Sequence, residues 1–304
     1  MKSLAQTISI GSTRHIDLIK ARLGCELKLL ERNGLKVKLA EQSEGKFTFI
    51  TCRLADKEEF IHREKDDRLL LKHFLANVIT DVILNHWEDL LVRGIIQENY
   101  YYFAEEDKDL IHRGALNRIN QGPDGQNGDS LRLIVRKSLI LQKVIEYLSG
   151  SNQIILDGFI KFRLKEYVNE LREAADKAVD DFLIEREYWE FVQILKYFVE
   201  IQEPRYELVH IVVRDGNNFS LFDENLQGIK TDSLEGCVIE LSNNEISYDD
   251  LFVSMLITLS PRKIALHRIC EGQSSLALDT IVNVFEGRVN WCPGCHLCQP
   301  GVQT

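Results

Sequence analysis

The stretch NQIILDGFIKFRLKEYVNELREAADKAVDDFLIEREYWEFVQILKYFVEIQEP, residues 152–204, contains the longest periodic segment of the 304-residue chain. Apolar residues recur in it at steps of three or four, which is the spacing of one face of a helix. A first set comprises Ile160, Leu164, Tyr167, Leu171, Ala175, Ala178 and Phe182, and a second set, after the charged run at 185–187, comprises Phe191, Leu195, Phe198 and Val199. The pattern fits two helices or one bent helix equally well, and its apolar faces must be covered.

The first 55 residues predict a β-α-β-β unit. A short strand at 6–10 precedes a helix with apolar residues at 16, 19, 23, 27 and 30, and two alternating stretches at 35–41 and 46–54 flank a turn at 43–45. The opposite face of the helix carries Arg14, Lys28 and Arg32. These basic residues suit an acidic partner or nucleic acid, but a solvated helix face explains them at least as well.

Residues 56–204 predict a helical domain. The stretch 69–96 is apolar nearly all round and indicates a helix that is buried on several sides. The run QGPDGQNGD at 121–129 is rich in glycine and predicts a loop, after which a new helix extends to Leu148. We expect these helices and the stretch at 152–204 to cover one another as an antiparallel bundle.

After Pro204 the apolar period changes from about 3.6 to 2. Strands are expected at 207–214, 218–223, 236–241, 263–269 and 288–291, with helices at 248–259 and 275–285. The last strand-helix-strand run predicts a β-α-β crossover with two parallel strands. The predicted fold is therefore mixed α+β and helix-rich, with a β-α-β-β unit at 1–55, a helical domain at 56–204 and an α/β unit at 205–304.

The composition restricts the classes of function. Hydrophobic residues make up 44% and charged residues 28% of the chain, and no apolar run approaches the roughly 20 residues of a membrane span. The N-terminal residues lack the apolar core of a signal peptide, which predicts a cytoplasmic protein with reduced cysteines. A net charge of −10 argues against a general nucleic-acid coat or an anionic-membrane binder.

A cysteine cluster, CPGCHLC at 292–298, is the strongest candidate for chemistry. Its three sulfurs are one short of the usual four ligands of zinc or of an iron–sulfur cluster. Parallel strands end at the same edge of a sheet, so Cys270 after one strand is expected near Cys292 after the next. The sequence therefore predicts a metal site of Cys270, Cys292, Cys295 and Cys298, with His296 or His267 as a substitute ligand, and it favours zinc over iron–sulfur. Free thiols near the end of the chain are the competing interpretation.

Other motifs carry little chemical signal. The segment 271–275 lies between a strand and a helix, where backbone amides can hold an anion, but an ordinary helix cap explains it better. His210 alternates with apolar neighbours and is typical of a core or edge histidine. The sequence contains no serine-nucleophile motif, paired-histidine zinc motif or dinucleotide fingerprint.

Three segments carry a family resemblance: DGFIKFRLKEY at 157–167, VDDFLIEREYWEFVQILKYFVEIQEP at 179–204 and FEGRVNWCPGCHLC at 285–298. They resemble the YtxC-like sporulation protein family of endospore-forming Firmicutes, from about residue 60 onward. The resemblance implies a cytoplasmic protein linked to spore formation and assigns no catalytic residue. The family's terminal cysteines correspond to Cys292, Cys295 and Cys298.

These observations favour a non-enzymatic protein that interacts with protein partners and carries a structural metal site. An enzyme that uses the cysteine cluster as a redox or iron–sulfur centre is the second hypothesis. A nucleic-acid role through Arg14, Lys28 and Arg32 is the third.

Overall fold

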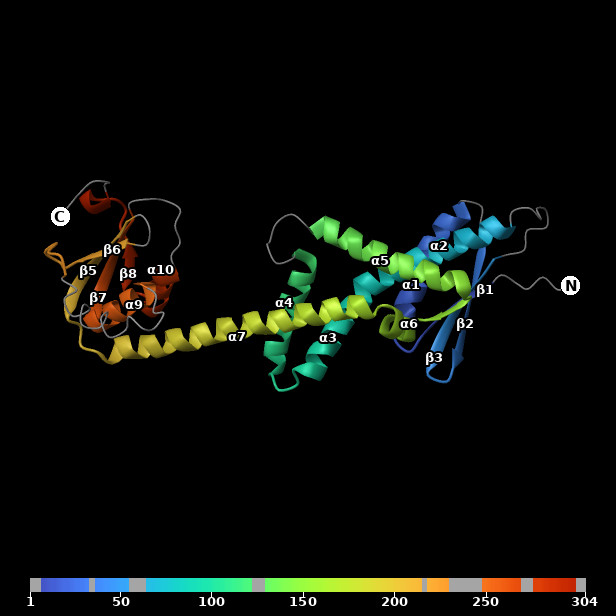
Figure 1. The fold of residues 1–304 in the computed structure, drawn as a ribbon, viewed down its shortest axis with the longest axis horizontal. Helices are drawn as coiled ribbons and strands as arrows, with labels where there is room; N and C mark the ends of the chain where they lie inside the picture. The colour runs from blue at the N-terminus through green and yellow to red at the C-terminus, as the bar shows by residue number, and fades with distance from the viewer. Residues whose placement is uncertain are drawn as a thin grey trace. The chain divides into compact units, whose positions relative to one another are not determined.

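The computed structural model describes residues 7–32, 36–54, 64–121, 129–214, 218–229, 248–268 and 276–298. The chain divides into two compact units, Met1–Leu183 and Ile184–Thr304, and helix α7 (Lys165–Ile201) contributes residues to both. Each unit has a four-stranded sheet and an apolar core of its own (Figure 1). The predicted fold class, mixed α+β and helix-rich, is confirmed.

The sheet of the first unit has the strand order β2-β3-β1-β4. Strand β1 (Thr7–Ser12) is followed by helix α1 (Ile16–Arg32) and by the antiparallel hairpin of β2 (Val37–Glu44) and β3 (Phe47–Leu54). Gly45 takes a φ of 60° in the hairpin turn, a left-handed conformation that glycine adopts without steric cost. The expected β-α-β-β arrangement is thus present.

Strand β4 (Gln153–Ile155) adds to this sheet from a distant part of the sequence and was not expected. It pairs in parallel with β1, with Ile154 opposite Ile10. Directly after it, the Asp157 carboxylate accepts hydrogen bonds from the Thr13 amide (2.9 Å), the Thr13 hydroxyl (2.8 Å) and the Ser12 hydroxyl (3.1 Å). Burial alone would raise the pKa of Asp157, but these donors outweigh it and lower the pKa.

The rest of the first unit, where the structure describes it, is mainly helical. Its helices are α2 (Glu64–Val82), α3 (Glu88–Asn99), α4 (Glu105–Gln121), α5 (Asp129–Gly150), α6 (Leu156–Arg163) and the first part of α7, and a π-helical turn, Ile83–Trp87, joins α2 to α3. The first apolar set of the opening stretch faces the core as expected, with six members buried and Phe182 partly buried. Helix α7 continues through the charged run at 185–187 and carries both apolar sets from Tyr167 onward, so the chain does not divide there. The helical geometry breaks earlier, at Leu164, between α6 and α7.

The second unit has the strand order β6-β5-β7-β8. It comprises β5 (Tyr206–Arg214), β6 (Asn218–Phe222), α9 (Tyr248–Leu259), β7 (Pro261–Arg268), α10 (Leu276–Val284), β8 (Val289–Trp291) and a short 3₁₀ helix, His296–Cys298. Strands β5, β7 and β8 are parallel, as the predicted crossover requires, and β6 is antiparallel to β5. The strand expected at 236–241 lies outside the described residues.

Within the part of the chain that the structure describes, no helix combines the length and the apolar content needed to cross a membrane.

A buried polar network holds the helices of the first unit together. The Tyr167 hydroxyl of α7 donates a 2.6 Å hydrogen bond to the Glu88 carboxylate at the start of α3. The Arg136 guanidinium of α5 lies 3.3 Å from the same carboxylate and also donates to the Asn120 side chain at 3.0 Å. Burial, together with the charge of Glu88, raises the pKa of Tyr167, so its hydroxyl keeps the proton that it donates.

We expect Tyr167→Phe to lower the free energy of unfolding by about 1–3 kcal/mol, because the buried Glu88 carboxylate loses a hydrogen-bond donor. Urea unfolding followed by circular dichroism measures the change. Tyr101→Phe is the matched control, because 75% of the Tyr101 surface is exposed. Equal stability of the two variants would contradict a structural role for the network.

Candidate metal centre

The parallel pairing of β7 with β8 places the cysteine cluster at the end of β7. Ile264 lies opposite Val289, and Leu266 lies opposite Trp291. The backbone then continues the pairing by one residue, because the Cys292 amide donates to the Leu266 carbonyl at 2.9 Å. The cysteine turn therefore begins beside His267, the next residue of β7.

The two faces of this sheet are covered differently. One face supplies Val209, Ile211, Ile264 and Leu266 to a core that also contains residues of α7, α9 and α10. Since side chains alternate along a strand, His210, Val212 and His267 belong to the other face. There Leu297 of the cysteine turn packs with Val212 and Phe222 in a small buried cluster. The cysteine turn thus lies on the face of the sheet that does not contribute to the main core.

His267, Cys292, Cys295 and Cys298 bring four potential ligand atoms within 4.8 Å of one another. The His267 Nδ1 atom lies 3.4 Å from the Cys295 sulfur and 3.5 Å from the Cys298 sulfur. Zinc bonds of about 2.3 Å to sulfur and 2.0–2.1 Å to nitrogen, at tetrahedral angles, separate ligand atoms by roughly 3.5–3.8 Å. The group therefore has the donor types of a tetrahedral zinc site, and the two nitrogen–sulfur distances match its spacing.

The backbone of the turn aims the three sulfurs inward. Gly294 takes a φ of 124°, which side chains rarely allow, and the Cys298 amide donates to the Cys295 carbonyl at 3.1 Å. Burial raises the pKa of Cys295, but the Leu297 amide and the neighbouring Cys292 thiol outweigh it, so the pKa is lowered. Cys52 gives the contrast, because burial in the first unit raises its pKa to about 12. The thiolate is the form that binds metal, so the lowered pKa of Cys295 favours ligation by its sulfur. The hydrogen bond from the Gly294 amide lowers the pKa of the adjacent Cys292, but burial and the Cys295 and Cys298 thiols outweigh it, so that pKa is raised.

His210 orients the histidine of the group. Its Nδ1 atom lies 2.9 Å from the Nε2 atom of His267, while the Nδ1 atom of His267 faces the sulfurs. Burial lowers the pKa of both histidines, which favours the neutral imidazole that ligates metals. With Nδ1 of His267 as the ligand atom, Nε2–H of His267 donates to His210. A histidine ligand held through its second nitrogen is a regular feature of metal sites.

The structure brings together three of the four cysteines in the predicted set. Cys292, Cys295 and Cys298 converge, whereas Cys270 lies outside the described residues. Within the described part of the chain, His267 takes the fourth position, and the side chain of His296, the other substitute, belongs to an exposed residue. The contact between His210 and His267 was not predicted. Alternation along β5 puts His210 and Val212 on one face, but only the register of β5 with β7, in which Val212 lies opposite His267, brings His210 close to His267.

The other sequence-derived candidates find less support. Arg14 is exposed, while the side chains of Lys28 and Arg32 and the segment 271–275 lie outside what the structure describes. Further basic residues of α1 are paired, since Lys20 binds Glu41 and Arg22 lies 3.0 Å from Asp81. The described part of α1 therefore offers no continuous cationic face for nucleic acid.

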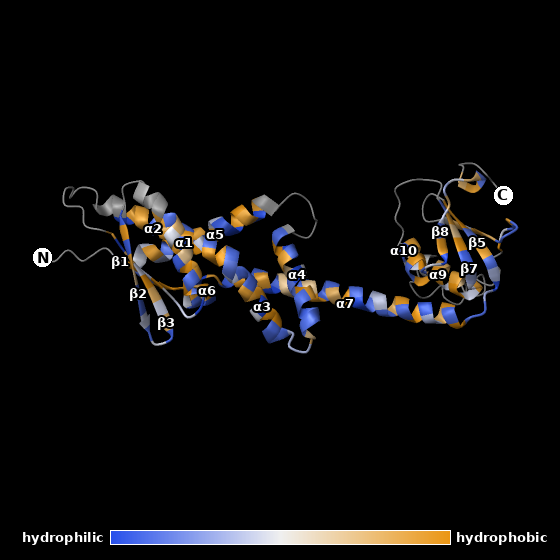
Figure 2. Ribbon diagram, turned by 180° about the vertical axis from the view of Figure 1, so that it is seen from behind, coloured by the Kyte–Doolittle hydropathy of each residue, from blue (hydrophilic) through white to orange (hydrophobic). Residues whose placement is uncertain are grey.

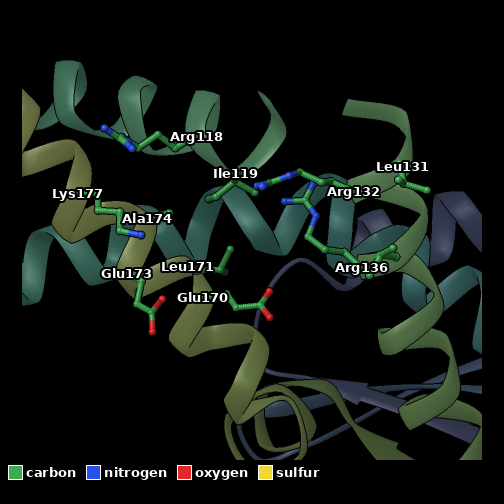
Figure 3. A pocket seen from close by; sticks show the side chains of 11 residues that line it. Arg118, Ile119, Leu131, Arg132, Arg136, Glu170, Leu171, Glu173, Ala174 and Lys177 are labelled. Carbon is green, nitrogen blue, oxygen red and sulfur yellow. The ribbon is translucent and has the colours of Figure 1, made fainter. Parts of the chain in front are cut away.

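A cavity of about 430 Å³ lies among α4, α5 and α7 in the first unit. Figure 3 shows the side chains of Arg132 and Arg136 extending toward Ile119, with the Glu170 carboxylate below them in the view. Arg118, also in the lining, is paired with Asp181. The lining thus combines basic, acidic and apolar side chains. It favours neither an anionic nor a cationic ligand.

Two comparisons with known proteins, one with sequence models of families and one with individual proteins, both point to YtxC. The sequence model of the YtxC-like family matches residues 73–290. A protein of Bacillus subtilis (strain 168), named "Uncharacterized protein YtxC", is 25% identical over 225 residues, which cover 73% of this chain and 78% of the relative. No solved structure matches the chain.

We expect His210→Phe to weaken zinc binding by about 10- to 100-fold, because His267 loses the acceptor that holds its tautomer and ring orientation. His210→Asn, whose side-chain oxygen can accept the same hydrogen bond, should recover part of the loss. The measurement is a competition titration with a zinc chelator under reducing conditions.

His73→Phe is the control, since His73 is an exposed histidine of α2 in the first unit. The orienting role of His210 is wrong if His210→Phe binds zinc as tightly as the control.

Proposed function

The chain belongs to the YtxC-like family, and we propose that it is a non-enzymatic protein of spore formation that acts through protein partners and carries a structural zinc ion. One observation carries the metal part of this proposal. His267, Cys292, Cys295 and Cys298 place four ligand atoms within 4.8 Å of one another. The link with spore formation rests on the sporulation family that the three sequence segments resemble.

The donor set supports zinc. Three thiolates and one imidazole form one of the usual structural zinc combinations. Four protein ligands also fill the tetrahedral shell, so no position remains for a substrate or an activated water. This closed shell favours a structural role over catalysis.

The short distances between the ligand atoms argue against the iron–sulfur alternative. In a cluster, the protein ligands bind different iron atoms across a cage of iron and sulfide, and the usual complement is four cysteines. Here the four ligand atoms lie within 4.8 Å of one another, which suits a single ion better than a cage of several irons, and one of them is a histidine nitrogen.

The ion would stabilise a segment that has few apolar contacts. The small cluster around the cysteine turn contains Leu297, Val212 and Phe222, with Cys295 packed against it. This core is small, so zinc would supply much of the free energy that holds the turn on the sheet. The turn begins after Trp291, of which 51% is exposed, and a fixed turn would present this surface to a partner.

We expect about one zinc per chain in protein purified without air, and loss of that zinc in Cys295→Ser. Because zinc binds the folded unit and not the unfolded chain, its loss should cost up to about 4 kcal/mol when free zinc is a thousandfold above the dissociation constant. Elemental analysis for zinc, iron and sulfide, with a visible spectrum and thermal unfolding, makes the measurement.

Cys25→Ser is the matched control, because Cys25 is exposed on α1 in the other unit. Iron with sulfide and a broad visible band would favour the iron–sulfur enzyme instead. Absence of metal from the wild-type protein would contradict the proposed metal site.

The role in spore formation has a separate test. We expect deletion of the gene in its host to lower the count of heat-resistant spores, and a wild-type copy to restore it. A Cys295→Ser copy should restore the count only in part, because the partner-facing turn is released. Unchanged spore counts after deletion would contradict the role, whatever the metal content.

A further inference from the structure

The part of α7 in the second unit has two apolar faces, and the described residues of this unit cover only one of them. Tyr188, Val192, Leu195 and Val199 pack into the core of the second unit. A second row lies beside this face, and we call it the outer row: Ile184, Phe191, Ile194, Phe198 and Ile201, which are exposed by 66, 52, 55, 45 and 59%. Tyr197, 61% exposed, flanks it. Figure 2 shows apolar residues recurring along this part of α7.

The outer row follows the spacing of a coiled coil. Ile184, Phe191 and Phe198 are separated by seven residues, and Ile194 and Ile201 repeat at the same interval three residues later. These are the a and d positions of successive heptads, which form the seam between paired helices. Glu187 occupies the one d position of this segment that is not apolar.

The exposed area matches what a stable pair of chains needs. At roughly 100 Å² for each of six large apolar side chains, the surface is about 600 Å² per copy and about 1,200 Å² for two copies. Stable interfaces begin at about this size. Contiguous apolar patches of several hundred Å² on a protein surface mark interaction sites.

We propose that this part of α7 pairs with the same part of α7 in a second copy of the chain, in an antiparallel, two-fold symmetric coiled coil. The a and d positions of the segment, Glu187 included, are symmetric about the midpoint between residues 192 and 193. Turning the helix end for end therefore places Ile184 against Ile201 of the second copy, and Phe191 against Ile194 of the second copy. A two-fold axis makes both contacts twice, as in most soluble homodimers.

Glu187 decides the direction of the pairing. In a parallel pair, equivalent positions meet, so the Glu187 carboxylates of both copies would lie together in an apolar seam. Like charges in a seam that excludes water are costly. In the antiparallel pair, Glu187 lies across from Phe198 of the second copy, and the two carboxylates are far apart.

Analytical ultracentrifugation of the full chain, with zinc and a reductant, tests the pairing. The wild-type protein should sediment as a dimer, and Ile194→Glu should weaken the dimer by roughly 100-fold or more, because each chain brings a charge to the centre of the seam. Gln193→Glu is the matched control, since this neighbour is exposed and lies outside both apolar rows. Circular dichroism and zinc content show whether each variant stays folded.

A wild-type monomer would overturn the proposal, including a monomer in which other residues of the same chain cover the outer row. Equal weakening by Gln193→Glu would overturn the assignment of the seam.

Photo-cross-linking tests the direction without using cysteine. Benzoylphenylalanine in place of Ile184, in a mixture of isotope-labelled and unlabelled chains, should give mixed cross-links to the peptide that contains Ile201. Mixed cross-links between the two peptides around residue 184 would show a parallel pair and overturn the antiparallel arrangement.

Discussion

The candidate metal centre depends on the register between β7 and β8. Parallel pairing sets Leu266 opposite Trp291, and the next residue of each strand is then a ligand candidate, His267 on one and Cys292 on the other. Cys295 and Cys298 follow within a single turn, so the register also determines where they lie. A shift of β8 by one residue along β7 would move Cys292 away from its place beside His267 and would turn the side chains of β8 to opposite faces.

The second unit is asymmetric, and its asymmetry explains why a metal suits it. Among the described residues, α7, α9, α10 and one face of the sheet share a core of sixteen buried residues, whereas the cluster on the other face has three. A hydrophobic cluster of that size supplies only a few kcal/mol, at about 1.5–3 kcal/mol for each fully buried side chain. Bonds to a metal ion can stabilise a short segment that buries few apolar side chains. Small folds use zinc for this reason where they cannot form a large core.

Features set by neighbouring residues were predictable from the sequence, and those set by distant pairing were not. Helix α9 was expected at its observed bounds, because its apolar run ends just before Pro261. Strand β4 was missed, because three residues, Gln153–Ile155, are too few to show a period and acquire their conformation from β1. The three cysteines of one turn were evident from their spacing. The role of His210 depends on the register of β5 with β7, which the composition of neither strand reveals.

Helix α7 shows the limit of periodicity most directly. The apolar set after residue 187 combined Phe191, Leu195, Phe198 and Val199, and spacing alone treats all four as residues to be covered. The structure separates them, because Leu195 and Val199 contact the core while Phe191 and Phe198 stay about half exposed. The helix is thus apolar over a wider arc than one unit can cover. Such an arc is costly in water unless a second surface meets it, and the heptad spacing of the uncovered part is the spacing that another helix fits.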